Sequence, residues 1–591
     1  MEVIIENIFN NKTQIIKQSF FSLMSVEILG AVVNSLNSTI DTVVIGQFLS
    51  VEAMAAVGFF SPMLTIISLV WIIIIGLQII CGKFIGKGDK ESLESLFATA
   101  VVFLGAIALI ASIICFAENN FLAKILGAQG ETAKLLQEYI KGYSIGIIGQ
   151  VYCALLMWFL AFNYDIKLSR IVIALMIISN FFLDIFFISI LDLGIFGLGL
   201  ASSFSYLLSA GVMLQSFFHK NKPIQLKFKK FLFAKLLKSA RFGIPSLTFN
   251  VGLTAKAYLL NITLMNYIGM SAVAVMNVQG AVIGVLGSIP VGCGNAFLAL
   301  GSLWFGSRDK ESLLILTKIT LKYTLLASVA IMILIMISSP VAPNLFFSQN
   351  EEAFEIAERM LFLFPSFLVL NALVGIFLKI YQIQKKSEFL VSSMPIFENL
   401  LIAILAVISV PFLGVDAVWL SFPATEIICL AIIAISVFIH SKKISFKLED
   451  WMKLDKNFGV DKKFVYEKNF ATIDDATTIS MEVINFCKQK NFPKNKAYFA
   501  GLAIEEIATN IIQYGFTADK KYNAYVRVTV EDEICIRIYD NASTFNLKEK
   551  LQNSIGKFPE EDNISLRIIE KILEKIDYQN NAGINTVVLV V

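Results

Sequence analysis

The sequence is poor in charged residues. Only 16% of its 591 residues are Asp, Glu, Lys or Arg, whereas 56% are hydrophobic, and the mean hydropathy is +0.72. A soluble chain usually carries about a quarter charged residues. This composition excludes an ordinary soluble enzyme and indicates a membrane protein. The net charge of +3 gives no indication of nucleic-acid binding.

Residues that carry metal, redox or ATP chemistry are scarce as well. The two histidines, His219 and His440, are too few for a histidine-based zinc site or proton relay. The seven cysteines show no CxxC spacing, and their odd number argues against a disulfide framework. No GxxxxGK[ST] motif occurs, which excludes a P-loop motor within this chain.

The charges that do occur are unevenly distributed. Residues 1–441 hold 27 Lys and Arg and 24 Asp and Glu, whereas residues 442–591 hold 22 of each. The first part therefore has the composition of a membrane domain and the second that of a soluble domain. Apolar windows long enough to cross a bilayer predict twelve helices, near residues 20–47, 56–81, 96–117, 137–161, 169–191, 195–218, 242–268, 273–302, 319–340, 359–382, 389–411 and 414–439.

The positions of Lys and Arg predict the topology of this bundle. None occurs in 18–82, 257–307 or 387–441, whereas the loop 219–241 carries eight. Because basic loops stay in the cytosol, we expect that loop and both termini to be cytosolic. The first 19 residues hold four charges and no long apolar run, so we expect no cleavable signal peptide.

An internal repeat supports an even division of the bundle. GKGDKESL at 86–93 recurs as GSRDKESL at 306–313, and the spacing of about 220 residues contains six predicted helices. Two halves of like orientation are typical of transporters that alternate between two open states, with the substrate site between the halves. A channel built from one chain is the less favoured alternative.

The run DTVVIGQFLSVEAMAAVGFFSP (41–62), followed by GKFIGKGDKESL and NFFLDIFFI (180–188), resembles the multidrug and toxic compound extrusion (MATE) transporters over about 430 residues. The resemblance implies antiport of amphipathic, often cationic organic compounds against Na⁺ or H⁺, in the cytoplasmic membrane of a prokaryote. A lipid-linked precursor flippase of related fold is a further alternative that these motifs disfavour.

Intramembrane ionisable residues predict where coupling occurs, because such residues usually face a partner or a water-filled cavity. In the first half these are Asp41 and Asp184. Asn34 shares a helical face with Asp41, and Asn180 shares one with Asp184. Ser202 and the adjacent Ser203 supply hydroxyl groups, which completes a hard-oxygen set suited to Na⁺ or proton exchange. In one branch of the family, the positions of Asp41, Asn180, Asp184 and Ser202 form a cation network.

The second half departs from another branch of the family, which uses a glutamate in the seventh helix. This stretch has Lys256 and no acid, and Lys256 either supplies a fixed countercharge or snorkels to the interface. Glu398 and Glu426 lie in the last two predicted helices, where Glu426 is a candidate second protonation site together with Lys256.

The soluble part alternates short strands with amphipathic helices. The pattern predicts helices over residues 476–487 and 496–516 and a hairpin formed by AYVRVTVE and EICIRIYD. It then predicts a helix over SLRIIEKILEKIDY and a closing strand over NTVVLVV. We therefore predict an α/β sandwich. The predicted organisation comprises an N-terminal segment 1–19, an N-lobe 20–218, a basic loop 219–241, a C-lobe 242–441, a linker 442–460 and a soluble domain 461–591.

EEIATNIIQYGF, IRIYDNASTF and the segment from Ser565 onward resemble the GHKL ATPase fold, in its anti-sigma-factor serine-kinase-like form. The resemblance implies that Glu506 orients or deprotonates the reacting group, that Asn510 holds Mg²⁺ among the phosphates, and that Asp540 accepts the adenine amino proton. Ala542, Asn563 and Ser565 stand where glycines are usual, and Tyr514 replaces a histidine. These departures leave Mg-ATP binding, and hence enzymatic activity of the domain, open.

The function predicted from the sequence is cation-coupled export of amphipathic, cationic organic compounds, with a cytosolic domain that binds nucleotide or docks a regulatory protein. The alternative is a membrane-anchored signalling protein whose soluble domain phosphorylates or sequesters a partner. Loss of transport in an Asp41 variant favours the first, and partner phosphorylation that depends on Glu506 favours the second.

Overall fold

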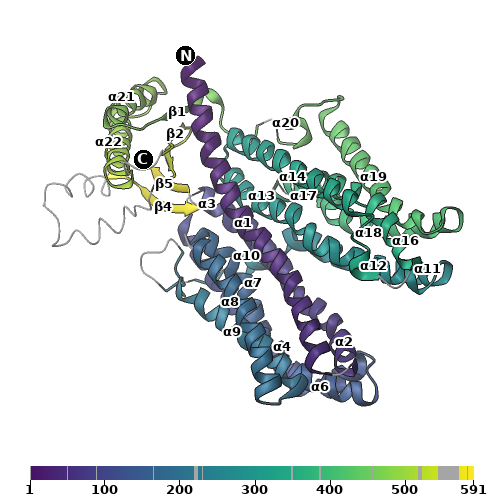
Figure 1. Cartoon of the computed structure of the whole chain (residues 1–591). Helices are drawn as coiled ribbons and strands as arrows, with labels where there is room; N and C mark the ends of the chain where they lie inside the picture. The colour runs from purple at the N-terminus through teal and green to yellow at the C-terminus, as the bar shows by residue number, and fades with distance from the viewer. Residues whose placement is uncertain are drawn as a thin grey trace.

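The structure is a computed structural model of the whole chain (Figure 1). It describes every residue except 1, 50, 88, 164–165, 219–223, 229, 348–350, 385–387, 456, 517–521, 543–571 and 582–583. At the start of the first helix, and again over 33–44, only the backbone is described.

The first half of the membrane part is an all-helical bundle, called the N-lobe here. Its elements are α1 (Glu2–Phe48), α2 (Val51–Ser68), α3 (Val70–Lys87), α4 (Lys90–Ala117), α5 (Asn119–Ile125), α6 (Gly130–Ser144), α7 (Ile147–Phe162), α8 (Ile166–Ile185), a π-helical turn η1 (Phe186–Ile190) and α9 (Gly194–Gln215).

The second half, the C-lobe, is helical as well. It is preceded by α10 (Phe233–Ala240), which lies in the basic loop and packs on α3 and α4 of the N-lobe, and by the short turn η2 (Arg241–Gly243). Its elements are α11 (Ile244–Tyr267), α12 (Met270–Leu286), α13 (Ser288–Gly306), α14 (Lys310–Ser338), α15 (Asn344–Phe347), α16 (Glu351–Leu363), α17 (Ser366–Gln384), α18 (Glu388–Leu413) and α19 (Asp416–Ser441).

Ten helices of the described chain are long and apolar enough to span a membrane, or eleven if the bent pair α6 and α7 is one span. The chain is thus a multi-pass membrane protein, but the predicted count of twelve exceeds what length and hydropathy support. The difference lies at 242–268, where α11 is 24 residues long but contains Lys256 and three asparagines that lower its hydropathy.

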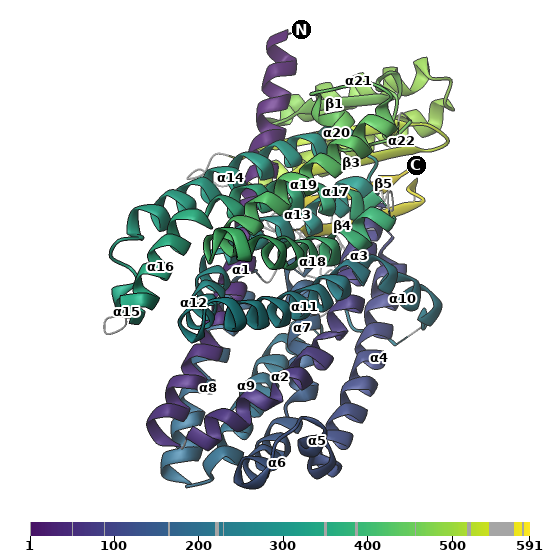
Figure 2. The ribbon, with the colours of Figure 1, turned by 90° about the vertical axis from the view of Figure 1, so that its right-hand side faces the viewer.

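The two lobes meet on the side of the soluble domain. Figures 1 and 2 show the N-lobe helices in purple and blue and the C-lobe helices in teal and green, approaching each other next to the sheet and diverging away from it. Close helix packing explains the contact: a Cβ atom at Gly82 or Gly86 of α3 would lie 1.8 Å from Ser302 Oγ or 2.1 Å from the Leu303 carbonyl oxygen of α13.

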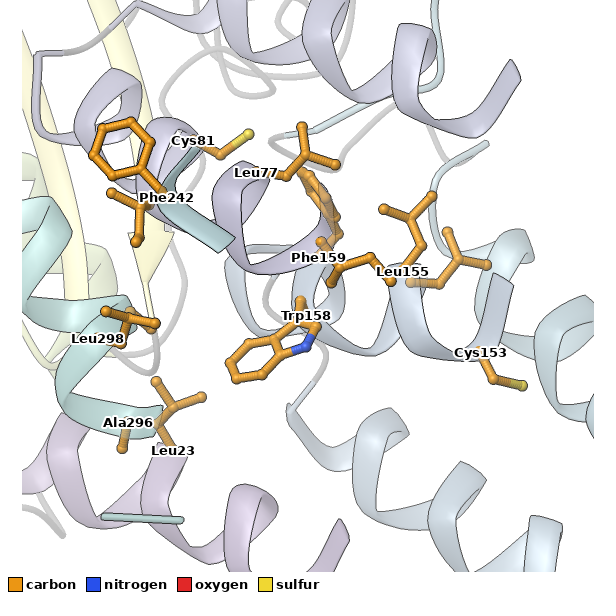
Figure 3. Packing of buried hydrophobic residues seen from close by; sticks show 14 of the residues in the cluster. Leu23, Leu77, Cys81, Cys153, Leu155, Trp158, Phe159, Phe242, Ala296 and Leu298 are labelled. Carbon is orange, nitrogen blue, oxygen red and sulfur yellow. The ribbon is translucent and has the colours of Figure 1, made fainter. Parts of the chain in front are cut away.

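Apolar side chains from both lobes fill the region beside this crossing (Figure 3). Leu77 and Cys81 of α3, Trp158 of α7 and Leu298 of α13 belong to one buried cluster. The cluster also takes in Leu23 of α1, so the first helix packs into the contact between the lobes. A bundle of this kind buries its core between the halves and leaves its outer apolar faces to lipid.

The soluble part, called the tail domain (residues 461–591), is built on a five-stranded antiparallel sheet with the order β1-β2-β3-β5-β4. Its strands are β1 (Val465–Asn469), β2 (Ala524–Val530), β3 (Ile534–Asp540), β4 (Lys575–Asn581) and β5 (Ile584–Val590). The short turn η3 (Lys462–Phe464) precedes β1, and α20 (Leu448–Trp451) lies in the linker.

Two helices, α21 (Ile473–Gln489) and α22 (Lys494–Asn510), followed by the π-helical turn η4 (Ile511–Gly515), cover one face of the sheet. Val526 and Val528 of β2 and Ile536 and Ile538 of β3 join these helices in a separate core. Because side chains alternate along a strand, Arg527, Arg537 and Tyr539 face the other way, toward the membrane part.

The predicted α/β sandwich and the hairpin of β2 and β3 are confirmed. The predicted helix over 565–578 is wrong at its end, because residues 575–578 belong to strand β4. In that strand Ile576 and Tyr578 pack on the domain core, an alternation of period two that the preceding helical pattern conceals.

Candidate functional site

Asn180 and Asp184 lie on consecutive turns of α8, as their spacing predicts, and both side chains are fully buried. Among the described residues, neither polar side-chain atom of Asn180 has a hydrogen-bond partner. Directly after Asp184 the helix widens into the π-helical turn η1. Turns of this type are frequent at functional sites, and a buried amide without a partner is costly unless water or an ion binds it.

Helix α8 packs against both α1 and α9, which brings together the three elements of the predicted cation network. Ser202 of α9 is 4% exposed. The neighbouring Ser203 has a structural role, because its hydroxyl donates a hydrogen bond to the carbonyl oxygen of Gly142 at 2.7 Å. The side chains of Asn34 and Asp41 lie outside the described residues, so their contribution stays a prediction.

The C-lobe holds a second buried polar cluster. The Asn371 amide of α17 donates to Glu398 of α18 at 3.1 Å and to Glu426 of α19 at 2.9 Å. Asn371 thus holds two buried carboxyl groups at one site. Because two buried acids at one site favour a state in which one of them carries a proton, this cluster is suited to exchange a proton.

Lys256 lies next to the same cluster. Its ammonium nitrogen is 5.3 Å from the centroid of the Phe422 ring and interacts electrostatically with Glu398 and Glu426. The fixed countercharge and the snorkelling lysine, the two alternatives that the sequence leaves open, both stay predictions.

A third set of polar residues was missed in the sequence. Lys379 of α17 donates to Asn295 Oδ1 of α13 at 3.0 Å, and Asn295 Nδ2 lies 3.5 Å from Glu27 of α1. Glu27 and Lys379 also interact electrostatically. A signal was available, because Glu27 and Lys379 are ionisable residues inside apolar windows, as Asp184 and Glu426 are. The contact joins the two lobes inside the bundle.

In the tail domain, Glu506 and Asn510 share one face of α22. The Asn510 amide donates to the Glu506 carbonyl oxygen at 2.8 Å and to its carboxylate at 3.0 Å. This is the pairing that the E-x-x-x-N spacing predicts. An acid and an amide held together beside the sheet are suited to orient a nucleophile and to coordinate Mg²⁺.

Asp540 ends β3 and is buried. Its Oδ1 atom accepts from Asn585 Nδ2 at 2.6 Å and from the Ala542 backbone amide at 2.9 Å. Burial raises the pKa of Asp540 to about 6, although these two hydrogen bonds lower it. Asn585 was not predicted from the sequence, because its place beside Asp540 depends on the pairing of β3 with β5. The residues 563–565 that would face the phosphates lie outside the described residues.

The comparisons with known proteins agree with this two-part architecture. The MatE family model matches residues 27–188, and the family model described as Histidine kinase-like ATPase domain matches residues 471–591. The comparison with curated proteins gives no match.

Solved structures extend the likeness over the whole membrane part. A MATE protein in complex with MaL6 is 21% identical, with 72% of this chain and 96% of that chain covered and a TM-score of 0.64. A multidrug resistance MATE family transporter of the MOP superfamily in an outward-facing conformation is 22% identical, with coverages of 72% and 95% and a TM-score of 0.65. A MOP superfamily transporter from Pyrococcus furiosus, described as having a binding pocket of reverse polarity, is 21% identical, with coverages of 72% and 95% and a TM-score of 0.63.

At these identities the structural likeness establishes the fold, and the family models place domains within it. The chain therefore combines a membrane part that has the fold of MATE transporters and matches the MatE model over 27–188 with a C-terminal domain that matches the model of the histidine-kinase-like ATPase domain.

Proposed function

We propose that the chain is a cation-coupled antiporter that exports amphipathic, cationic organic compounds by alternating access. The observation that carries the proposal is the buried pair Asn180 and Asp184, placed before a π-helical turn within a MATE fold. A carboxylate, an amide oxygen and a hydroxyl group form a set that binds Na⁺ or exchanges a proton. The basic loops favour a cytosolic location for the tail side, in the cytoplasmic membrane of a prokaryote.

In this mechanism, cation binding at Asp41, Asn180, Asp184 and Ser202 repacks the N-lobe helices and expels the substrate from the space between the lobes. The cluster of Glu398, Glu426 and Lys256 is a second place where a proton can be taken up. The ion gradient then supplies the driving force, since the chain has no P-loop motor.

Replacing Asp184 with Asn tests the proposal. The variant keeps the shape of the side chain but removes the charge that a cation neutralises, so we expect gradient-driven export of a fluorescent cationic dye from proteoliposomes to be lost. The matched control is Asp192→Asn, because Asp192 lies on the exposed turn that follows η1. Normal export by Asp184→Asn under both Na⁺ and H⁺ gradients would rule out the assigned site.

For the tail domain we propose nucleotide binding with a regulatory role. The residues present fit Mg-ATP: Asn510 would hold the metal ion, Asp540 the adenine amino group, and Glu506 would orient the reacting group. Bound nucleotide supplies phosphate chemistry or binding energy. A separate regulatory protein would dock on a surface of the tail domain other than the sheet face, because the membrane part already covers that face.

A further inference from the structure

The outer face of the tail sheet packs directly on the membrane part. The ring of Tyr539 in β3 lies 5.2 Å from that of Trp304 in α13, and Arg537 donates to the Gly86 carbonyl oxygen of α3 at 3.5 Å. Tyr525 stacks on Tyr539 and is itself fully buried. The face of the sheet opposite α21 and α22 is therefore an interface between the domains.

A buried cluster of charges holds this interface together. Lys12 of α1 lies 3.2 Å from Glu467 of β1 and 3.5 Å from Asp309 at the start of α14. Arg527 of β2 lies 2.9 Å from Asp309 and 2.6 Å from Glu467. Lys12, Asp309 and Arg527 are at most 4% exposed. The N-lobe, the C-lobe and the tail domain thus each contribute a charge to one desolvated network, which is named the tail cluster here.

The electrostatics of the tail cluster depend on all three parts being in place. Burial raises the pKa of Asp309, but Arg527 and Lys12 outweigh it and hold that pKa well below its ordinary value. A buried charge that loses its partner is strongly destabilised. The cluster is therefore favourable only in the docked arrangement.

The tail domain sits across the crossing of α3 and α13, the contact between the lobes on this side. Besides Gly82 and Gly86, Gly306 is packed so closely that a Cβ atom would lie 2.5 Å from the Lys83 carbonyl oxygen. If the protein works by alternating access, these two helices must separate to open the tail side. The tail domain is held to the N-lobe through Arg537 and Lys12, and to the C-lobe through Trp304 and Asp309. The two helices therefore cannot separate unless one of these two sets of contacts breaks.

The linker distinguishes the two sides. It joins the tail domain covalently to the C-lobe and packs there, with Phe458 stacked on Phe305 at 4.7 Å and the Tyr381 hydroxyl donating to the Trp451 carbonyl oxygen at 2.8 Å. The N-lobe holds the tail domain through noncovalent contacts, such as the hydrogen bond that the Asn541 amide donates to Gln18 at 2.8 Å. The tail domain is thus tethered to the C-lobe and can be released from the N-lobe.

We propose that the tail domain is an intramolecular clamp, which means that it binds both lobes of the membrane part of its own chain. Docked across the lobe junction, it holds the tail side closed, and its release from the N-lobe permits the alternate state. The inference rests on the proposed alternating-access function and adds its regulation.

A reversible cross-link in the full chain tests the clamp. We expect a disulfide between Gln18→Cys and Asn541→Cys, introduced in a protein with its native cysteines replaced, to stop dye export from proteoliposomes, and reduction to restore it. Each single-cysteine variant is the control for the substitution itself. Undiminished export by the fully cross-linked protein would overturn the proposal.

A second experiment measures how accessible the contact between the two lobes is, and it does not depend on transport. Ser302→Cys places a thiol at the α3 contact, where a maleimide reaches it only when the lobes separate. Glu467→Gln removes the tail-domain charge next to Lys12, so we expect labelling from the tail side to rise roughly tenfold, the effect of one charge-assisted hydrogen bond. The matched control is Glu482→Gln, because Glu482 contacts Lys468 and Tyr466 within the tail domain and lies outside the tail cluster.

Equal labelling in Glu467→Gln and in the parent, or rapid labelling already in the parent, would also overturn the clamp. Because labelling needs no substrate, a chain that exports no dye but shows the expected labelling would refute the proposed substrate class while supporting the clamp.

Discussion

At the scale of single residues, neighbouring positions of β3 serve opposite faces of the tail sheet. Asp540 lies at the end of the strand on the side of α22, where the family resemblance places the adenine, whereas Tyr539 packs on Trp304 of the membrane part. Asp540 is held by Asn585 of the adjacent strand. A change at Asp540 therefore acts on the same strand that packs on the membrane part.

The raised pKa of Asp540 predicts a pH-dependent stability. The pKa is about 6 in the folded protein against an ordinary 3.8, so the folded state binds the proton more tightly than the unfolded state. The resulting stabilisation is complete below pH 3.8 and is lost as the pH rises through 6. Between pH 7.5 and pH 5 we expect a gain of about 1.4 kcal/mol.

Thermal unfolding of the full chain in detergent at the two pH values measures this gain. Asp540→Asn should abolish its share of the difference in Tm, whereas Asp532→Asn, in the exposed turn between β2 and β3, should leave it unchanged. An identical pH response in Asp540→Asn and the parent would show that this carboxyl group does not titrate as described.

At the scale of elements, the two copies of the internal repeat have acquired different tasks. Asp89 caps α4 by accepting from the Ser92 amide at 3.1 Å, and Asp309 caps α14 by accepting from the Ser312 amide at 3.0 Å. The caps are equivalent, as the repeat predicts. Only Asp309 also pairs with Arg527 and thereby joins the tail cluster.

This difference predicts unequal costs for the same substitution. Asp89→Ala should lower the free energy of unfolding by about 1 kcal/mol, the usual loss for an N-cap. Asp309→Ala additionally leaves Arg527 and Lys12 with fewer partners in a buried network, so we expect a further loss of about 3 kcal/mol. The Tm of each variant of the full chain gives the comparison, and equal shifts would mean that the tail cluster contributes nothing to stability.

The membrane architecture was predictable from the sequence because apolar windows and basic loops follow from the bilayer itself. The pairs Asn180 with Asp184 and Glu506 with Asn510 were predictable because four residues make one helical turn. Contacts between distant segments were not: Asn371 with its two glutamates, and Glu27 with Lys379, depend on helix packing. Lys12 looked like one of four charges in a solvated N-terminal segment, yet it is buried against β1 and β2.

At the scale of the whole molecule, the two faces of the tail sheet are covered by different parts of the chain. One face packs on α21 and α22, and the other packs on the membrane part. The sheet face that carries Tyr539 is covered by the membrane part, so the nucleotide proposed for the tail domain would have to approach from the side of α22. Binding on the side of α22 can therefore affect the contact with the membrane part only through the strands that lie between the two.

Mg-ATP binding is best tested in the full chain, because the sheet face would otherwise be exposed. We expect a fluorescent ATP analogue to bind in the presence of Mg²⁺ and the binding to be lost in Asn510→Ala, since the amide would hold the metal ion. Asn495→Ala, an exposed position at the start of the same helix, is the control. Absence of binding by the folded parent would leave the tail domain as a docking module alone.

The length of α1 has a mechanical consequence. Its 47 residues form one helix about 70 Å long, anchored at one end by Lys12 and carrying Asp41 about 43 Å further along. A continuous helix of this length acts as a lever: tilting it by about 5° around Lys12 displaces the far end at Phe48, about 54 Å away, by roughly 5 Å. Small movements of the tail domain are thereby magnified on the opposite side of the membrane, where the first helix meets α2.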